Sequence, residues 1–303
     1  MTLIDRMSFD LNDNNLYVKR DDLLPFSFGG NKARKAVKFF DEIENNGNDV
    51  VVTYGSACSN HCRIIANIAA SKGIKCVIVS PEENYEESVN SKMVKFFGAQ
   101  IVKTPLTKVS ETIENIMQDL KKTSNPYFIQ GGGHGNKGTE AYVDAYNEIL
   151  EYEQNNNVKF DYIFHASGTG TTQAGLVVGR LLNNRTEQKI VGISIARNLT
   201  RGKKVILDSI NNYFGDTRNY DSEVDFVDDY ICGGYGKYNQ EIVSIIKDVF
   251  KNDGMALNTT YTGKAFYGMK EYILKNEISK KNILFINTGG LPLFFDVVGR
   301  IVE

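Results

Sequence analysis

Long hydrophobic runs are absent from this 303-residue chain. No stretch of about 18 apolar residues occurs, so the sequence predicts no transmembrane helix. The first residues lack a basic region followed by an apolar stretch, so we expect no signal peptide and a cytoplasmic protein. The net charge is −2, which gives no electrostatic reason to expect a nucleic acid or a membrane surface as a partner.

Cysteine and histidine are also scarce, with four and three residues. Four cysteines in a chain of this length do not form a disulfide framework. Cys58, His61 and Cys62 lie close enough in sequence to suggest metal ligands, but a zinc site usually draws on a second ligand pair. Neither His134 nor His165 belongs to such a pair. The sequence therefore predicts no metal site.

Apolar segments of strand length alternate with longer amphipathic segments. Hydrophobic residues make up 42% and charged residues 24%, as in an ordinary soluble globular protein. The predicted strands are residues 49–54, 75–80, 99–103, 126–130, 162–166, 189–195 and 281–287. The predicted helices are residues 59–72, 87–97, 108–123, 138–153, 172–183, 239–252 and 263–276. This alternation, with continuous Val/Ile runs in the strands, indicates an α/β fold of buried parallel sheets flanked by helices.

The chain is longer than the size at which one hydrophobic core stops growing, so we expect two lobes. Two polar segments interrupt the alternation. Residues 151–159 are a predicted crossing between the lobes, and the charge-dense residues 209–229 are a predicted irregular surface excursion.

Lys32 follows Gly29, Gly30 and Asn31 and opens an amphipathic segment that continues through residues 33–40. Most lysines are solvated surface residues, and that interpretation stays open here. Paired glycines before a helix, however, usually serve a close backbone approach or unusual dihedral angles. A lysine fixed at such a turn could form a Schiff base.

Residues 166–172 (Ala-Ser-Gly-Thr-Gly-Thr-Thr) are a hydroxyl-rich glycine loop between an apolar strand and a helix. Free amide hydrogens and the positive end of the helix dipole favour a phosphate there. The loop is neither a Walker loop nor a dinucleotide fingerprint, because the Gly-Lys-Ser/Thr and the third glycine are missing. A tight helix-packing turn is the alternative. Together with Lys32, the loop suggests a phosphorylated aldehyde held at both ends, which indicates pyridoxal 5′-phosphate (PLP).

Residues 55–61 again join a strand to a helix. Ser59 or Asn60 could serve as the helix N-cap, which is the commonest use of these residues at that place. A ligand carboxylate could equally dock on the same amides.

These features, in this order, resemble the fold type II pyridoxal-phosphate enzymes. Within that family the chain is most similar to the branch of 1-aminocyclopropane-1-carboxylate deaminase and D-cysteine desulfhydrase. The resemblance runs nearly end to end and rests on residues 18–23, 29–35, 59–63, 166–176, 234–236, 261–265 and 287–292.

The resemblance implies roles for individual residues. The implied catalytic residues are Lys32, which would hold the cofactor and move the substrate's Cα proton, and Ser59, Tyr235 and Tyr261. The implied cofactor-binding residues are Asn60 at the phenolic oxygen, Thr288 at the pyridine nitrogen, and Gly168, Thr169, Gly170, Thr171 and Thr172 at the phosphate. The implied substrate-binding residues are Ser59 and His61 at the carboxylate, with Tyr235 and Tyr261 over the reacting face.

A threonine beside the pyridine nitrogen stabilises a neutral ring and a shallow electron sink, which suits the loss of a good β leaving group. In the deaminases a tyrosine and an adjacent glutamate stand at the positions of Tyr261 and Thr262, so the threonine here favours the desulfhydrase side. The resemblance therefore implies a PLP-dependent lyase or deaminase that releases pyruvate, ammonia and sulfide from D-cysteine. The alternatives are a 1-aminocyclopropane-1-carboxylate deaminase, a β-replacement synthase and a non-catalytic PLP-binding protein.

Three positions depart from the branch. Cys58 stands where glutamine is usual, Asn287 where histidine is usual, and Leu291 begins Leu-Pro-Leu in place of Ala-Pro-Ala. All three are expected to border the substrate pocket, although Cys58 and Leu291 could equally serve only in packing.

The resemblance and the strand pattern together imply the domain organisation. Residues 1–47 and 157–303 would form a large PLP-binding domain, and residues 48–156 a small inserted α/β domain. The cofactor would lie in the cleft between them. The family also implies a homodimer and a small amino acid as substrate.

Overall fold

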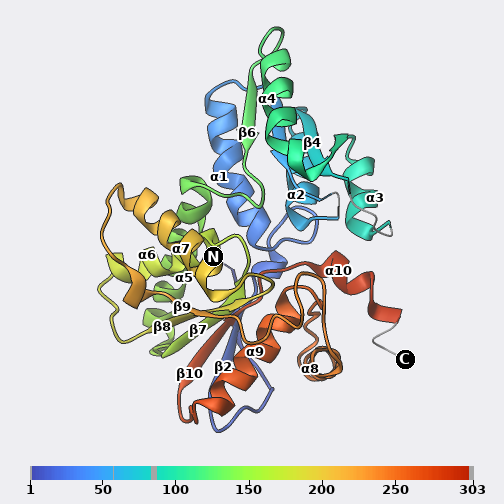
Figure 1. Ribbon diagram of the computed structural model, residues 1–303. Coiled ribbons are helices and arrows are strands. Elements are labelled where there is room, and N and C mark those ends of the chain that lie inside the picture. The colour runs from blue at the N-terminus through green and yellow to red at the C-terminus, as the bar shows by residue number, and fades with distance from the viewer. Residues whose placement is uncertain (1, 57, 83–86, 300–303) are drawn as a thin grey trace.

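Two sheets organise the chain in the computed structural model, which describes residues 2–56, 58–82 and 87–299 (Figure 1). The strands are β1 (Ile4–Arg6), β2 (Asn15–Lys19), β3 (Val50–Tyr54), β4 (Lys75–Pro81), β5 (Gln100–Thr104), β6 (Pro126–Ile129), β7 (Tyr162–Ser167), β8 (Lys189–Ser194), β9 (Asp225–Val227) and β10 (Asn282–Ile286). The larger sheet has the order β1-β2-β10-β7-β8-β9, and the smaller β5-β4-β3-β6. Neighbouring strands are parallel except for the β1–β2 pair.

Helices cover both faces of each sheet. They are α1 (Asn31–Asn45), α2 (Asn60–Ser71), α3 (Val89–Phe96), α4 (Val109–Leu120), α5 (Asn136–Asn156), α6 (Thr171–Leu182), α7 (Leu199–Phe214), α8 (Gln240–Asp253), α9 (Thr262–Lys275) and α10 (Leu291–Phe295). In the larger lobe α5, α6 and α7 pack on one face, and α8 and α9 on the other. In the smaller lobe α1 and α2 pack opposite α4. The predicted two-lobed α/β architecture is confirmed.

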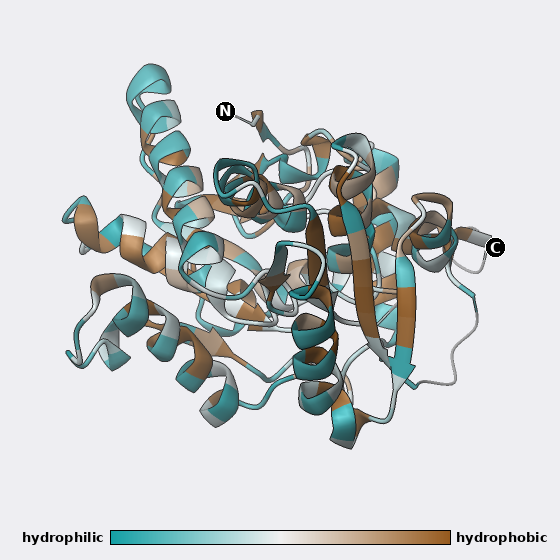
Figure 2. Ribbon diagram, turned by 90° about the horizontal axis from the view of Figure 1, so that it is seen from above, coloured by the Kyte–Doolittle hydropathy of each residue, from teal (hydrophilic) through white to brown (hydrophobic). Residues whose placement is uncertain are grey.

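The central strands β3, β4, β7, β8 and β10 are largely apolar because both of their faces are buried. In β3, Val51 packs with α1 and α2, whereas Val50 and Val52 face α4. All three side chains have an exposed fraction of 1% or less. Figure 2 shows the same layering, with predominantly hydrophobic strands inside and hydrophilic turns on the surrounding helices. Strands buried in this way fit the Val/Ile runs of the sequence.

The structure corrects the predictions for the two polar segments, residues 151–159 and 209–229. Residues 151–156 belong to α5 rather than to a crossing between lobes. Residues 209–214 are the last turns of α7, and residues 225–227 form the edge strand β9. Helix α7 was not predicted, although Ile206 and Ile210 carry its apolar stripe into the core of the larger lobe. Gly202 lets it lie against the sheet, since a Cβ there would stand 2.1 Å from the ring of Phe226.

Core packing bears on where the two lobes divide. The apolar face of α1 (Ala33, Ala36, Phe39, Phe40 and Ile43) belongs to the core of the smaller lobe. Helix α5 packs instead on α6 in the core of the larger lobe. This packing favours divisions just before α1 and just before α5, and the division at 47/48 and 156/157 stays a prediction. Among the described residues no helix combines the length and the apolar character needed to cross a membrane.

Candidate active site

A cavity of about 550 Å³ lies between the two lobes. Its walls are the loops that follow β3, β6, β7, β8 and β10, together with the start of α1. Ligands of parallel sheets lie beyond the carboxyl ends of the strands, so this is the expected place for a site. The predicted residues that line it are Lys32, Ser59, Asn60, Gly168, Thr169, Gly170, Thr172, Tyr235, Tyr261 and Thr288.

Lys32 enters the cavity from the first turn of α1. Gly30 has φ 94°, and a Cβ on it would stand 2.6 Å from the carbonyl oxygen of Thr288, so a glycine is needed for this close approach. Asn31 N donates to that same oxygen at 3.0 Å. Lys32 Nζ donates to the carbonyl oxygen of Gly132 at 2.8 Å. Burial lowers the pKa of Lys32 to about 8, which makes the neutral amine accessible near physiological pH.

The predicted phosphate loop runs from Gly168 into the N-terminus of α6. Thr171 does not line the cavity, because its side chain is buried and its Oγ1 accepts a 2.7 Å hydrogen bond from Lys35 Nζ. Lys35 was missed by the sequence analysis, although its i,i+3 spacing places it on the same helix face as Lys32. The residue is 1% exposed, and burial, followed by the charge of Lys32, holds its pKa well below the usual value. A buried amine at a helix N-terminus fits a bound phosphate, which would stabilise the charged form of that amine.

In the Ser59–His61 turn, Ser59 and Asn60 line the cavity, whereas His61 is buried in the core. Ser59 caps α2, its hydroxyl accepting from His61 N at 3.1 Å. The structure does not bring the ring of His61, which was predicted at the substrate carboxylate, into the cavity. The residue is 2% exposed, and its Nε2 lies 2.8 Å from Thr53 Oγ1 inside the smaller lobe. Successive side chains point in different directions around a helix, and that of His61 is turned to the core.

Two tyrosines from different segments meet over the cavity. The hydroxyls of Tyr235 and Tyr261 are 2.5 Å apart, and their rings are in edge-to-face contact. Burial, and then the neighbouring Tyr235, raise the pKa of Tyr261 well above the usual value, so its phenol is protonated at neutral pH. Tyr261 therefore offers an O–H group rather than a negative charge.

Gln130, His134 and Arg197 are among the further residues that line the cavity and that the sequence analysis did not assign to it. Gln130 and His134 flank a run of glycines after β6, and the left-handed φ of Gly132 and Gly133 marks a sharp turn. A Cβ on Gly132 would stand 2.7 Å from Thr169 Cγ2 and 3.4 Å from Lys32 Nζ. This glycine run was the signal that could have identified the wall.

None of the three positions that depart from the branch lines the cavity. Asn287 is fully buried, with its Oδ1 accepting from Gly289 N. Leu291 packs against the core of the larger lobe. The carbonyl oxygen of Cys58 accepts from Asn90 Nδ2 at 2.8 Å. The structure therefore does not place these three residues in the cavity wall, where they were expected.

Comparisons with known proteins match this geometry. The model of the family described as "Pyridoxal-phosphate dependent enzyme" matches residues 1–289. The chain belongs to this family. It is 31% identical to the D-cysteine desulfhydrase of Serratia proteamaculans, over 92% of this chain and 88% of that protein. It is 34% identical to the putative 1-aminocyclopropane-1-carboxylate deaminase of Pyrococcus horikoshii, over 91% and 85%.

Solved structures agree. A crystal structure described as an ACC deaminase homologue has a TM-score of 0.85 at 29% identity, and the match covers 99% of this chain and 93% of that one. A hydrogen sulfide-producing enzyme from Fusobacterium nucleatum shares the fold, with a TM-score of 0.71 at 19% identity over 95% and 93% of the chains. The chain is therefore a PLP-dependent lyase of the fold type II family, in the branch of desulfhydrases and deaminases.

The described residues fit PLP. Lys32 supplies a buried amine of lowered pKa, and the loop at the start of α6 supplies amides and hydroxyls for the phosphate. Lys35 supplies a nearby amine that a phosphate would hold in its charged form. In the described part of the chain its side-chain hydrogen bond goes to Thr171 and not to a carboxylate. Thr288 lines the cavity from the loop that follows β10.

The pKa of Lys32 leads to a pH prediction. In protein stripped of cofactor, the rate of PLP capture should rise about tenfold per pH unit below pH 8 and level off above it, because only the neutral amine attacks the aldehyde. Stopped-flow absorbance from pH 6.5 to 9.5 measures this rate. A profile still rising steeply to pH 9.5, as for a solvated lysine, would contradict the assigned environment of Lys32.

Proposed function

We propose that the chain catalyses β-elimination from a small amino acid of the D-cysteine type, with release of pyruvate, ammonia and sulfide. The observation that carries the proposal is the set of hydrogen bonds made by Thr262. Its Oγ1 accepts hydrogen bonds from N and Nδ2 of Asn258, both at 3.0 Å, so the residue closes the start of α9. Among the described residues no aspartate or glutamate lines the cavity. The carboxylate that the deaminases carry beside their tyrosine thus has no counterpart here.

Different residues around the cavity would bind different groups of the substrate and the cofactor. Ser59 and the free amides at the start of α2 would bind the substrate carboxylate, because a helix N-terminus attracts anions. Asn60 would donate to the cofactor's phenolic oxygen, Thr288 would face the ring nitrogen, and Gly168–Thr172 with Lys35 would hold the phosphate.

Proton transfer would depend on Lys32 and the tyrosine pair. When bound, PLP supplies an electron sink conjugated to the substrate's Cα. Neutral Lys32 would remove the Cα proton, the Cβ–S bond would break with its electron pair leaving on sulfur, and water would complete the release of pyruvate and ammonia. The hydroxyl groups of Tyr235 and Tyr261 would lie beside the departing sulfur, and the protonated phenol of Tyr261 would donate to it.

The substrate assay tests this proposal. Protein loaded with PLP is supplied in parallel with D-cysteine, L-cysteine and 1-aminocyclopropane-1-carboxylate, and pyruvate, sulfide and 2-oxobutanoate are measured separately. We expect equal amounts of pyruvate and sulfide from D-cysteine and no 2-oxobutanoate, the four-carbon keto acid that deamination of the cyclopropane would give. 2-Oxobutanoate from the cyclopropane, with no pyruvate from D-cysteine, would assign the deaminase activity instead, the activity for which the Pyrococcus relatives are named.

The same assay addresses β-replacement. A thiol or amine nucleophile added with D-cysteine would divert product from pyruvate to a new amino acid if replacement were the natural reaction. We propose that pyruvate yield stays unchanged.

We also propose that the protein is a cytoplasmic homodimer.

A further inference from the structure

Arg63, Asn60 and Asn90 form a closed set of hydrogen bonds behind the cavity wall. Arg63 Nη1 donates to Asn60 Oδ1 at 2.8 Å and to Asn90 Oδ1 at 2.6 Å. Asn90 Nδ2 donates to Asn60 Oδ1 at 3.0 Å and to the carbonyl oxygen of Cys58 at 2.8 Å. Arg63 follows Asn60 by three residues on α2, so both occupy one helix face. Asn90 comes from α3.

The two ends of this set fix the orientation of both amides. A guanidinium can only donate and a carbonyl oxygen can only accept. Asn90 must therefore turn its Oδ1 to Arg63 and its Nδ2 to Cys58 and Asn60. Asn60 must turn its Oδ1 inward, toward two donors, and its Nδ2 outward. Within the described ranges Asn60 Nδ2 donates to no protein atom, and a Cβ on Gly290 would stand 3.0 Å from it.

The buried charge of Arg63 is otherwise unaccounted for. Its side chain is 0% exposed, and among the described residues its Nε and Nη2 have no hydrogen-bond partner and its guanidinium no carboxylate within ion-pair distance. Burial lowers the pKa of Arg63 only to about 10, so the cation persists at neutral pH. An unpaired buried cation is costly for folding, and a hydrophobic residue would fill the same space at less cost. This cost indicates a function.

We propose that Arg63 is a positioning residue that, together with Asn90, holds the amide of Asn60 with its Nδ2 toward the phenolic oxygen of PLP. This inference rests on the placement of that oxygen at Asn60 under the proposed function, and not on which amino acid is the substrate. A donor fixed at this oxygen, with a cation behind it, stabilises the more negative, deprotonated form of the Lys32-bound cofactor. The pKa read from the cofactor's absorption spectrum is thereby lowered.

The experiment removes the donor that Asn90 supplies to Asn60 without changing the shape of the set. Asn90→Asp gives Arg63 a carboxylate partner, which favours folding, and places an acceptor where Asn90 Nδ2 donated to Asn60 Oδ1, so that Arg63 Nη1 is the donor that remains there. The amide of Asn60 is then held less firmly with its Nδ2 toward the cofactor. We expect the pH midpoint of the absorption change to rise by about one unit in the loaded variant. Asn60→Ala should raise the midpoint by a similar amount.

The double variant separates positioning from a simple charge effect. If the set acts through Asn60, Asn90→Asp should shift the midpoint by less than half as much in the Asn60→Ala background. The other charged and titratable groups at the cavity, His134, Arg197, Tyr235 and Tyr261, are the same in every variant. Lys35 is likewise unchanged.

Each outcome decides between the accounts. Equal shifts from Asn90→Asp in both backgrounds, or none in either, would overturn the inference while leaving the proposed function intact. No shift from Asn60→Ala would overturn the placement of the phenolic oxygen and the inference with it. Loss of the shift in the double variant supports the positioning role of Arg63.

Discussion

Replacing Lys32 by alanine is expected to lower the rate of pyruvate release by at least about 1000-fold. Lys32 Nζ is the amine placed in the cavity beside Gly132, and burial has already lowered its pKa to about 8. The variant should also lose the visible absorption that a lysine-bound PLP gives, while keeping its fold, because the change removes only a side chain that ends in the cavity. Turnover and absorption spectra of matched samples check both effects.

Lys38→Ala is the matched control for this substitution. Lys38 lies on the same helix but pairs with Glu140 and Asp144 on α5, outside the cavity. Its loss should leave turnover within about twofold, since a partly exposed ion pair contributes little. A Lys32→Ala protein that kept more than a tenth of the activity would require another base and another attachment point for the cofactor.

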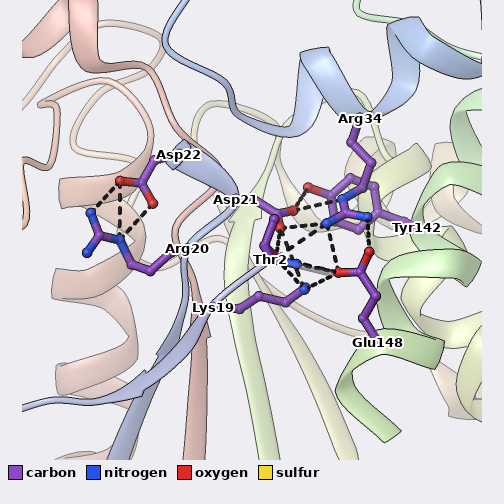
Figure 3. A network of polar contacts seen from close by, with 8 residues as sticks. All are labelled: Thr2, Lys19, Arg20, Asp21, Asp22, Arg34, Tyr142 and Glu148. Carbon is purple, nitrogen blue, oxygen red and sulfur yellow. Dashed lines mark hydrogen bonds and ion pairs between the residues drawn. The ribbon is translucent and has the colours of Figure 1, made fainter. Parts of the chain in front are cut away.

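Asp21→Asn is expected to lower the free energy of unfolding by about 3 to 5 kcal/mol. Figure 3 shows the reason: Asp21 lies in a network that joins Lys19 of β2, Arg34 of α1, and Tyr142 and Glu148 of α5. Asp21 is 0% exposed, accepts from Arg34 Nη2 at 2.9 Å and from Tyr142 Oη at 2.7 Å, and its backbone oxygen accepts from Gly30 N. Removing its charge leaves buried cations with one carboxylate fewer.

Asp22→Asn is the control, because Asp22 is adjacent and pairs with the partly exposed Arg20, as Figure 3 also shows. It should cost about 1 kcal/mol or less. Denaturant unfolding of the two variants beside the unmodified protein gives both values. Equal losses for Asp21→Asn and Asp22→Asn would mean that the buried network adds no stability of its own.

The same network predicts the acid dependence of stability. Burial raises the pKa of Glu148, but hydrogen bonds and charge from Arg34 and Lys19 outweigh it and lower the pKa to about 2. A carboxylate with a depressed folded-state pKa contributes stability above its unfolded value near 4.5, and that stability is lost as pH falls toward 2. The Asp21 pKa is lowered by the same two cations against burial. The loss between pH 5 and 2 should be shallower in Asp21→Asn.

Features that depend on local pattern were predictable from the sequence. The parallel sheets follow from uninterrupted Val/Ile runs, and the cavity loops follow from glycines and hydroxyls between a strand and a helix. Lys32, Asn60 and Thr288 line one cavity because short motifs at the ends of parallel strands meet at one edge. The short strands β1, β2 and β9 were not found, because their mixed polar and apolar sequences lack the Val/Ile runs of the predicted strands.

Features that depend on side-chain direction were not predictable. Nothing in the Ser-Asn-His pattern says that His61 turns inward to Thr53 while its two neighbours line the cavity. Lys35 and Arg63 are buried without a carboxylate partner in the described part of the chain, and sequence statistics place such residues on the surface. Their positions follow from the tertiary packing of α1 against α5 and of α2 against α3.

The attachment point of the cofactor is the most direct test of the account. Protein loaded with PLP is treated with borohydride, which adds hydrogen across the bond between the cofactor's aldehyde carbon and the amine that holds it, and the peptides are then identified by mass. The account predicts the added mass on Lys32 alone. The mass on Lys35, Lys264 or any other lysine would contradict the assignment of Lys32 and the mechanism built on it.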